Sequence, residues 1–265
     1  MQPKPATLTD SKSQSWLATL PANVVQIIRP HGLSPILLVC EHAANLIPDG
    51  LNRLGLDETA AKSHIAWDPG AMKVAELLSA AFGATLVAQK ISRLVYDCNR
   101  PPESAEAVRD SSEIYRIPGN TGLSTAQRDE RTRYIYTPFR QAVAAQMESR
   151  SAPVLVTIHS FTPVYNGTPR AVEVGILHDR DSRLADAMLT AAAQNPAFRT
   201  ARNTPYGPED GVTHTLVEHA LPRGLLNVMI EVRNDLIINE KAQKKLAAWL
   251  SEILTSALAA TAKDA

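Results

Sequence analysis

Short apolar runs, separated by segments with helical periodicity, constrain the fold of this chain most strongly. The runs fall at residues 35–40, 85–88, 153–158, 172–177 and 227–230. Several of them have apolar residues on both faces, which is typical of strands buried on both faces of a sheet. Helical segments are predicted at 71–82, 125–148, 181–194, 212–220 and 238–260. This alternation favours an α/β fold with three layers, in which helices cover both faces of a central, mostly parallel or mixed sheet.

The chain of 265 residues is long enough to bury one large core. Its first 25 residues are polar and contain proline. We therefore predict a flexible N-terminal arm over residues 1–25 and a single domain over residues 26–265.

Some local features can also be predicted. A further strand is expected at Leu94–Tyr96, and the serine-, proline- and glycine-containing segment 101–123 is expected to be a long loop. Ser124 and Gln127 have the spacing of a capping box at the start of a helix. Pro138 is expected to interrupt that helix.

The overall charge excludes some classes of partner. Lysine plus arginine and aspartate plus glutamate number 27 each, so the net charge is zero. Nucleic acid and anionic membranes are therefore not expected as partners, and an acidic substrate would need a local group of arginines.

The remaining composition favours a cytoplasmic protein. The two cysteines do not make a disulfide framework, and the N-terminus lacks the apolar core of a secretory signal. No apolar stretch reaches the roughly 18 residues of a membrane span.

Polar side chains collect where the predicted strands end. Glu41 and His42 follow the first strand, His159 and Ser160 follow residues 153–158, and Glu231 follows residues 227–230. In open α/β sheets, ligands bind at the carboxyl ends of the strands. The sequence therefore predicts an active site at this edge of the sheet.

The two histidines at strand ends indicate a metal site. A catalytic zinc takes three protein ligands, usually histidines and a carboxylate, and keeps one position open for water. His42 and His159 are the first two candidate ligands, and Asp68 is the best third candidate. An alternative interpretation makes Asp68 a helix N-cap before Pro69.

At these positions the chain resembles the N-formylglutamate amidohydrolase family over residues 34 to about 240. The resemblance rests on five motifs in the family's order: Glu41-His42-Ala43-Ala44-Asn45, Trp67-Asp68-Pro69-Gly70-Ala71, Ser92-Arg93 with Asp97-Cys98-Asn99-Arg100, His159-Ser160 and Glu231-Val232-Arg233-Asn234-Asp235. It implies a relation to zinc carboxypeptidases and aspartoacylases. It also implies a central mixed sheet, zinc, and a water that attacks a carbonyl carbon.

The resemblance also implies roles for single residues. Asn99 and Arg100 match the pair with which those relatives hold a substrate carboxylate, and Glu231 matches their general base. His219 matches a histidine near the substrate, although a helix-end histidine would look the same in sequence. Where those relatives have His-x-x-Glu, this chain has His42-Ala43-Ala44-Asn45, so the third metal ligand stays open between Asp68, Asn45 and Glu41.

Arginine side chains are suited to a carboxylate clamp, because the guanidinium can grip both carboxylate oxygens. Arg93 and Arg100 are the candidates, with ion pairing, for instance to Asp97, as the alternative. Ser160 is a candidate substrate contact or a turn residue. Glu231 is a general base or the partner of Arg233.

Together these features predict a metal-dependent amidohydrolase that cleaves the formamide or amide bond of an N-formyl or N-acyl acidic amino acid, such as N-formylglutamate. The expected cofactor is zinc or another divalent transition metal, and the partner is a small acidic N-acylated substrate. The alternatives are a zinc peptidase or amidase for another carboxylate-bearing substrate, and a carboxylate-binding relative without catalysis. The sequence does not determine the oligomeric state.

Overall fold

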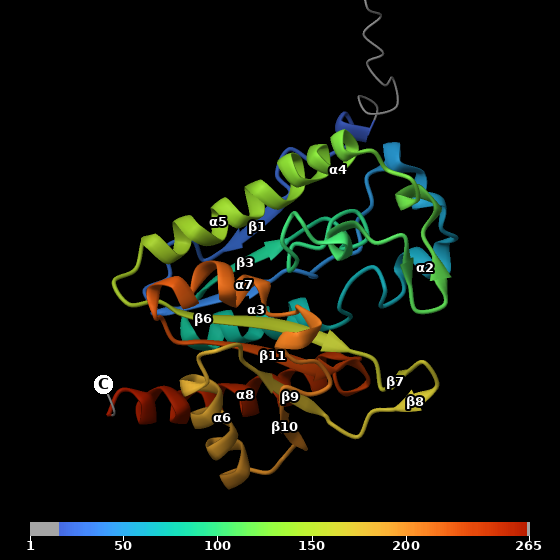
Figure 1. Ribbon diagram of the computed structural model, residues 1–265. Helices are drawn as coiled ribbons and strands as arrows, with labels where there is room; N and C mark the ends of the chain where they lie inside the picture. Colours follow the sequence, from blue (N-terminus) through green and yellow to red (C-terminus); the bar gives the residue numbers. More distant parts are fainter. Residues whose placement is uncertain (1–15, 264–265) are drawn as a thin grey trace, which may run out of the picture.

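A mixed sheet is the centre of the fold, in a computed structural model that describes residues 16–263. Within this part of the chain the sheet has seven strands in the order β1-β3-β2-β6-β11-β9-β10 (Figure 1). Their bounds are Val25–Ile28 (β1), Ile36–Cys40 (β2), Thr85–Gln89 (β3), Val154–Phe161 (β6), Val174–Leu177 (β9), Thr200–Arg202 (β10) and Asn227–Arg233 (β11). The central strands β3, β2, β6 and β11 are parallel, whereas β1 and β9 each run antiparallel to their neighbours β3 and β11. The predicted α/β class with a mixed sheet is confirmed.

Helices cover both faces of the sheet, because side chains of a strand point alternately to either side. In β2, Leu38 packs in the core under α3, α6 and α8, while Leu37 packs in the opposite core with α5. Figure 1 shows α5 and α8 on opposite sides of the sheet. The α-helix bounds are Glu58–Lys62 (α2), Ala71–Phe82 (α3), Thr125–Arg131 (α4), Thr137–Glu148 (α5), Arg183–Gln194 (α6), His214–His219 (α7) and Glu240–Thr261 (α8). The three predicted layers are therefore present.

Short elements fill the connections. Two small hairpins pair β4 with β5 and β7 with β8. Their bounds are Ser111–Ser112 (β4), Tyr115–Arg116 (β5), Val164–Tyr165 (β7) and Thr168–Pro169 (β8), and the short helical turns span Asp49–Gly55, Ala105–Val108, Pro118–Asn120, Pro208–Asp210, Leu221–Arg223 and Asn234–Leu236.

Two local predictions concern the helix expected over residues 125–148, which the structure forms as α4 and α5. The Ser124–Gln127 capping box is confirmed, with both of its reciprocal hydrogen bonds present. The interruption expected near Pro138 is present, because the α-helix ends at Arg131 and a π-helical segment, Thr132–Tyr136, leads into α5 directly before this proline.

The strand predicted at Leu94–Tyr96 is also wrong. The segment is a buried turn, closed by a hydrogen bond from the Val95 N–H to the Ser92 carbonyl at 2.9 Å. Its three apolar side chains pack into the core that contains α5. A run this short is equally compatible with a strand and with a buried turn.

Part of the predicted N-terminal arm packs on the domain. Residues 1–15 lie outside the described residues. Trp16 is buried, and its indole N–H donates to Glu130 at 2.8 Å. Val24 is buried as well, and β1 starts at the next residue. Single apolar anchors of this kind do not stand out in a polar segment.

The sheet order determines which polar residues meet. Strands β2, β6 and β11 are neighbours and parallel, so the residues at their carboxyl ends share one edge. Strand β9 runs the opposite way, so His178 at its end lies at the other edge. Among the described residues, no helix has the length and apolar character needed to cross a membrane.

Candidate active site

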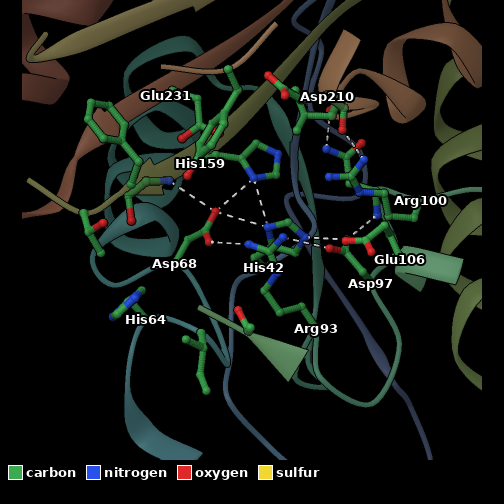
Figure 2. Close-up of a pocket in the computed structure, with 18 of the residues that line it drawn as sticks. His42, His64, Asp68, Arg93, Asp97, Arg100, Glu106, His159, Asp210 and Glu231 are labelled. Atoms are coloured by element: carbon green, nitrogen blue, oxygen red, sulfur yellow. Dashed lines mark hydrogen bonds and ion pairs between the residues drawn. The ribbon is translucent and has the colours of Figure 1, made fainter. Parts of the chain in front are cut away.

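A cavity of about 290 Å³ opens at the carboxyl ends of the parallel strands. Figure 2 shows the labelled side chains that converge on it. The predicted site residues that line it are His42, Asp68, Arg93, Asn99, Arg100, His159, Ser160 and Glu231. The structure therefore brings together most of the residues singled out from sequence.

Three ligand atoms form a compact triangle at the base of the cavity. His159 Nδ1 lies 3.1 Å from His42 Nδ1 and 2.9 Å from Asp68 Oδ2, and the last two atoms are 3.2 Å apart. Tetrahedral zinc with bonds of about 2.0 to 2.1 Å has ligand atoms roughly 3.3 Å apart. The spacing of the three atoms therefore fits the ligands of such an ion.

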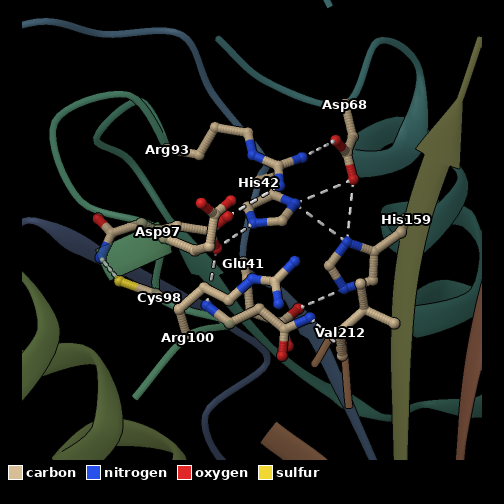
Figure 3. Close-up of polar contacts among 12 residues, drawn as sticks. Glu41, His42, Asp68, Arg93, Asp97, Cys98, Arg100, His159 and Val212 are labelled. Carbon is tan, nitrogen blue, oxygen red and sulfur yellow. Dashed lines mark hydrogen bonds and ion pairs between the residues drawn. The ribbon is translucent and has the colours of Figure 1, made fainter. Parts of the chain in front are cut away.

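The outer nitrogen of each histidine faces a second carboxylate (Figure 3). His42 Nε2 lies 2.7 Å from Asp97 Oδ1, and His159 Nε2 lies 3.1 Å from Glu41 Oε2. The Asp97 carboxylate accepts the Nε2 proton of His42, and the Glu41 carboxylate lies in ion-pair contact with His159 Nε2. A negative charge at Nε2 favours a proton on that nitrogen and leaves the Nδ1 lone pair directed at the triangle. Metal-binding histidines are commonly oriented by carboxylates in this way.

Arg93 and Ser160 hold the carboxylates in place. The Arg93 guanidinium donates to Asp97 Oδ2 at 2.8 Å and to Asp68 Oδ1 at 3.4 Å. The Ser160 N–H donates to Asp68 Oδ2 at 3.2 Å, and its hydroxyl donates to the Pro69 carbonyl. Both residues were predicted as substrate contacts, and both support the triangle.

The buried cluster around the triangle is rich in carboxylates. Within residues 16–263, Glu41, Asp68, Asp97 and Glu231 are carboxylates at most 4% exposed around the triangle. Only Arg93 forms ion pairs with them as a permanent cation in the described structure. Buried charges are costly unless they are paired, so this donor set fits a divalent ion.

The histidine protons compensate for part of this charge in the metal-free protein. Burial opposes the protonation of His159, but the Glu41 and Asp68 carboxylates outweigh burial and raise its pKa well above the usual value. For Asp68, burial is outweighed by His42 and His159, which hold the pKa of this carboxyl far below its ordinary range. A proton between His159 and Asp68 thus occupies the position that a metal cation bound to the triangle would take.

Glu231 faces the triangle from the neighbouring strand. Its Cα is paired with that of His159 in the parallel β6–β11 register. The Oε2 atom is buried and has no hydrogen-bond partner among the described residues. Burial raises the pKa of Glu231 to about 7, a value suited to accepting and returning a proton near neutral pH. The alternative pairing with Arg233 is not seen, since Arg233 contacts Asp235 and Glu173.

Asn99 and Arg100 are adjacent in sequence but differently engaged. The Asn99 amide donates to the Val212 carbonyl, and its oxygen accepts from Thr215 at 3.1 Å. The Arg100 guanidinium donates to the Asp210 carbonyl, and it has no carboxylate partner within residues 16–263. Asn99 therefore anchors the 212–215 segment, while Arg100 presents an unneutralised charge to the cavity.

The remaining candidates lie outside the triangle. His219 ends α7 and does not line the cavity. Asn45 does not line it either, and Glu41 reaches the site through His159. Of the three possible third ligands, only Asp68 joins the two histidines in one group within the described structure.

The sequence analysis missed the roles of Glu41 and Asp97 as carboxylates that orient histidines. Glu41 directly precedes His42 in the chain, yet its carboxylate contacts His159. No local sequence pattern indicates this contact. Asp97 lies four residues after Arg93 and binds it, which was read only as a surface ion pair.

Comparison with known proteins shows the family and the fold that this chain shares. The profile of the N-formylglutamate amidohydrolase family matches residues 34–238. The crystal structure of gene product Atu2144 from Agrobacterium tumefaciens is 55% identical, covers 90% of this chain and 96% of its own, and has a TM-score of 0.89. The crystal structure of N-formylglutamate amidohydrolase from Ralstonia eutropha JMP134 is 18% identical and covers 87% of this chain and 95% of its own; with a TM-score of 0.61, it shows a shared fold. No curated protein matched.

Proposed function

The chain belongs to the N-formylglutamate amidohydrolase family of hydrolases, which act on carbon–nitrogen bonds other than peptide bonds, and from this premise we propose its substrate and cofactor. The proposed activity is metal-dependent cleavage of the formamide or amide bond of an N-formyl or N-acyl acidic amino acid, such as N-formylglutamate. The proposed cofactor is zinc or another divalent transition metal, bound by His42, Asp68 and His159.

The triangle of ligand atoms is the observation that carries the proposal. The ligand atoms of His42, Asp68 and His159 lie within 3.2 Å of one another. Lone pairs at such distances repel each other unless a cation or a proton lies between them. The carboxylates behind both histidines support the cation, because they favour the tautomers that ligate a metal.

The chemistry that such an ion supplies is Lewis acidity, which lowers the pKa of water and polarises a carbonyl. Glu231 takes a proton from the attacking water and delivers it to the leaving nitrogen. The carbon–nitrogen bond breaks, the acyl carbon keeps the oxygen of the water, and the nitrogen leaves as an amine. With N-formylglutamate the products are formate and glutamate.

Arg100 is the proposed carboxylate contact. Figure 2 shows Arg100 and Glu231 on opposite sides of the histidines. A substrate whose amide carbonyl faces the triangle can thus place a carboxylate against Arg100, where a guanidinium binds both oxygens.

One observation favours a second candidate, an amidase for a substrate with a single carboxylate. Of the arginines that line the cavity, Arg93 pairs with Asp68 and Asp97, and Arg109 pairs with Glu106 at 2.9 Å. Arg100 alone among them is free for an anion in the described structure. Activity on N-formylglutamine that equals activity on N-formylglutamate would favour this candidate.

Formate release tests the proposed function. The zinc-loaded protein should release formate from N-formylglutamate, lose this activity after chelation, and regain it when zinc is restored. Activity that persists after complete removal of metal would contradict the metal-dependent mechanism. If neither formate nor another carboxylic acid were released from any N-formyl or N-acyl amino acid, the proposed substrate class would be contradicted.

A further inference from the structure

An arginine outside the predicted site lies in an aromatic cage at the wall of the cavity. The Arg170 guanidinium carbon is 4.5, 4.8 and 5.5 Å from the ring centroids of Tyr165, Tyr206 and Phe161. All three rings line the cavity. Arg170 has no carboxylate partner among the described residues. Its charge is therefore not neutralised by a nearby carboxylate, and it makes cation–π contacts with the three rings.

Arg170 is held rigidly and fixes one phenol. Its backbone N–H donates to the Pro163 carbonyl at 2.8 Å, and its carbonyl accepts from the Arg233 guanidinium at 3.0 Å. Its Nη2 donates to the Tyr206 hydroxyl oxygen at 3.0 Å. An arginine suits this task better than a lysine, because its planar group stacks on rings while donating in a fixed direction.

The hydrogen bonds of Tyr206 leave one proton unused. A phenol donates one hydrogen bond, and its oxygen already accepts from Arg170. Within residues 16–263 the Tyr206 hydroxyl donates no hydrogen bond to another residue. Burial and the Glu231 carboxylate raise the pKa of Tyr206, so the hydroxyl keeps this proton at neutral pH. The Tyr206 hydroxyl is thus a polarised donor without a partner in the described structure, and it lines the same cavity as Glu231, the proposed general base.

We propose that the Tyr206 hydroxyl donates a hydrogen bond to the scissile carbonyl oxygen as that oxygen becomes anionic, and that Arg170 is its positioning residue. This proposal rests on the proposed function, because it assigns a donor to the same hydrolysis. A donor fixed before the reaction stabilises charge that develops in the transition state more than it stabilises the substrate. The cation behind the phenol strengthens the bond by polarising the O–H group.

Kinetics of matched variants test the proposal. In the zinc-loaded protein, Tyr206→Phe removes only the hydroxyl, and Arg170→Met removes the charge while keeping most of the side-chain bulk. The controls are Tyr134→Phe and Arg133→Met, since Arg133 lies 5.6 Å over the Tyr134 ring and neither residue lines the cavity. Unfolding temperatures show whether each variant is folded.

Tyr206→Phe should lower kcat by roughly 10²- to 10³-fold, the range for the loss of one oxyanion donor, with little change in KM. Arg170→Met should lower kcat in the same direction, and Arg170→Lys should recover part of the loss. The double variant should be no worse than Tyr206→Phe, because Arg170 acts through Tyr206. The controls should match the wild type.

Two results would overturn the proposal while leaving the proposed function intact. One is a wild-type kcat in Tyr206→Phe; the other is an effect confined to KM, which would make Tyr206 a contact of the ground-state substrate. If the wild type hydrolyses no N-acyl amino acid, the proposed function fails, and calorimetric binding of formate then decides on Tyr206. Weakening of about tenfold in Tyr206→Phe and Arg170→Met supports the donor, and unchanged affinity refutes it.

Discussion

At the scale of single residues, the site separates groups that face the reacting atoms from groups that orient them. His42, Asp68 and His159 present their ligand atoms to one point, while Glu41 and Asp97 face the outer nitrogens of the histidines. Glu231 stands apart, because its carboxylate has an oxygen without a partner in the described structure. Replacing a residue of each kind should therefore change a different measured quantity, either the rate of catalysis or the affinity for metal.

Replacing Glu231 by glutamine should remove proton transfer and keep substrate binding. Glutamine preserves the size of the side chain but accepts no proton at neutral pH. We expect kcat to fall roughly 10²- to 10⁴-fold with a KM close to that of the wild type. Steady-state kinetics of formate release measure both values. A kcat within a factor of two of the wild type would show that another group is the base.

Replacing Asp97 by asparagine should weaken metal binding without removing a ligand. The amide can present its NH₂ group to His42 Nε2, which favours the tautomer that does not ligate. The expected loss in zinc affinity is about 10- to 100-fold, as for other groups that orient ligands, measured by competition with a chromogenic chelator. Asp129→Asn on exposed α4 is the matched control. Equal affinities in the two variants would remove Asp97 from this role.

At the scale of elements, the turn at Pro208–Asp210 positions the proposed carboxylate contact. The Arg100 guanidinium donates to the Asp210 carbonyl in this turn. The next residue, Gly211, has φ 66°, and a Cβ there would lie 2.7 Å from Arg100 Nη1. A side chain at Gly211 must therefore push the guanidinium away from its position.

Gly211→Ala should consequently raise KM for the acidic substrate about tenfold and leave kcat nearly unchanged. Gly224→Ala controls for backbone strain, because Gly224 has a similar φ of 61° and nothing lies within 4 Å of its added Cβ. Both variants should lose similar stability in thermal unfolding. If KM changes equally in both, Arg100 does not hold the substrate.

Single elements also show what the sequence could reveal. Buried strands such as β2 and β6 were predictable from continuous apolar runs, and long helices such as α8 from a helical periodicity that spans the whole element. The antiparallel direction of β9 was not predictable, because an apolar run looks the same in sequence whether the strand is parallel or antiparallel to its neighbour. The site at the parallel strand ends followed from His42 and His159. The contact between Glu41 and His159 could not be predicted from sequence, since it depends on how β2 and β6 are aligned.

At the scale of the whole molecule, the buried Glu231 carboxylate lowers the free energy of unfolding when it is charged. Burial raises the pKa of Glu231 to about 7 from its ordinary value of 4.5. The folded state therefore holds a proton that the unfolded chain releases at lower pH. Stability linked to this proton is complete below about pH 4.5 and is lost as the pH rises through 7.

The metal-free Glu231→Gln protein should therefore unfold at a higher temperature than metal-free wild type at pH 8. The difference should shrink as the pH is lowered from 7 toward 4.5, because Glu231 in the folded wild type then takes up its proton and loses its buried charge. Thermal unfolding monitored by circular dichroism after chelation measures this gap. A gap independent of pH would mean that the charge of Glu231 is not what destabilises the fold.

Zinc titration of the metal-free protein tests the ligand assignment most directly. Isothermal calorimetry on the wild type, His42→Ala and His159→Ala would be read together with their unfolding temperatures in the metal-free state. We predict about one zinc per wild-type chain, and an affinity at least tenfold lower in each folded variant, because each lacks one of three ligands. Wild-type stoichiometry and affinity in both variants would contradict a metal centre at His42, Asp68 and His159.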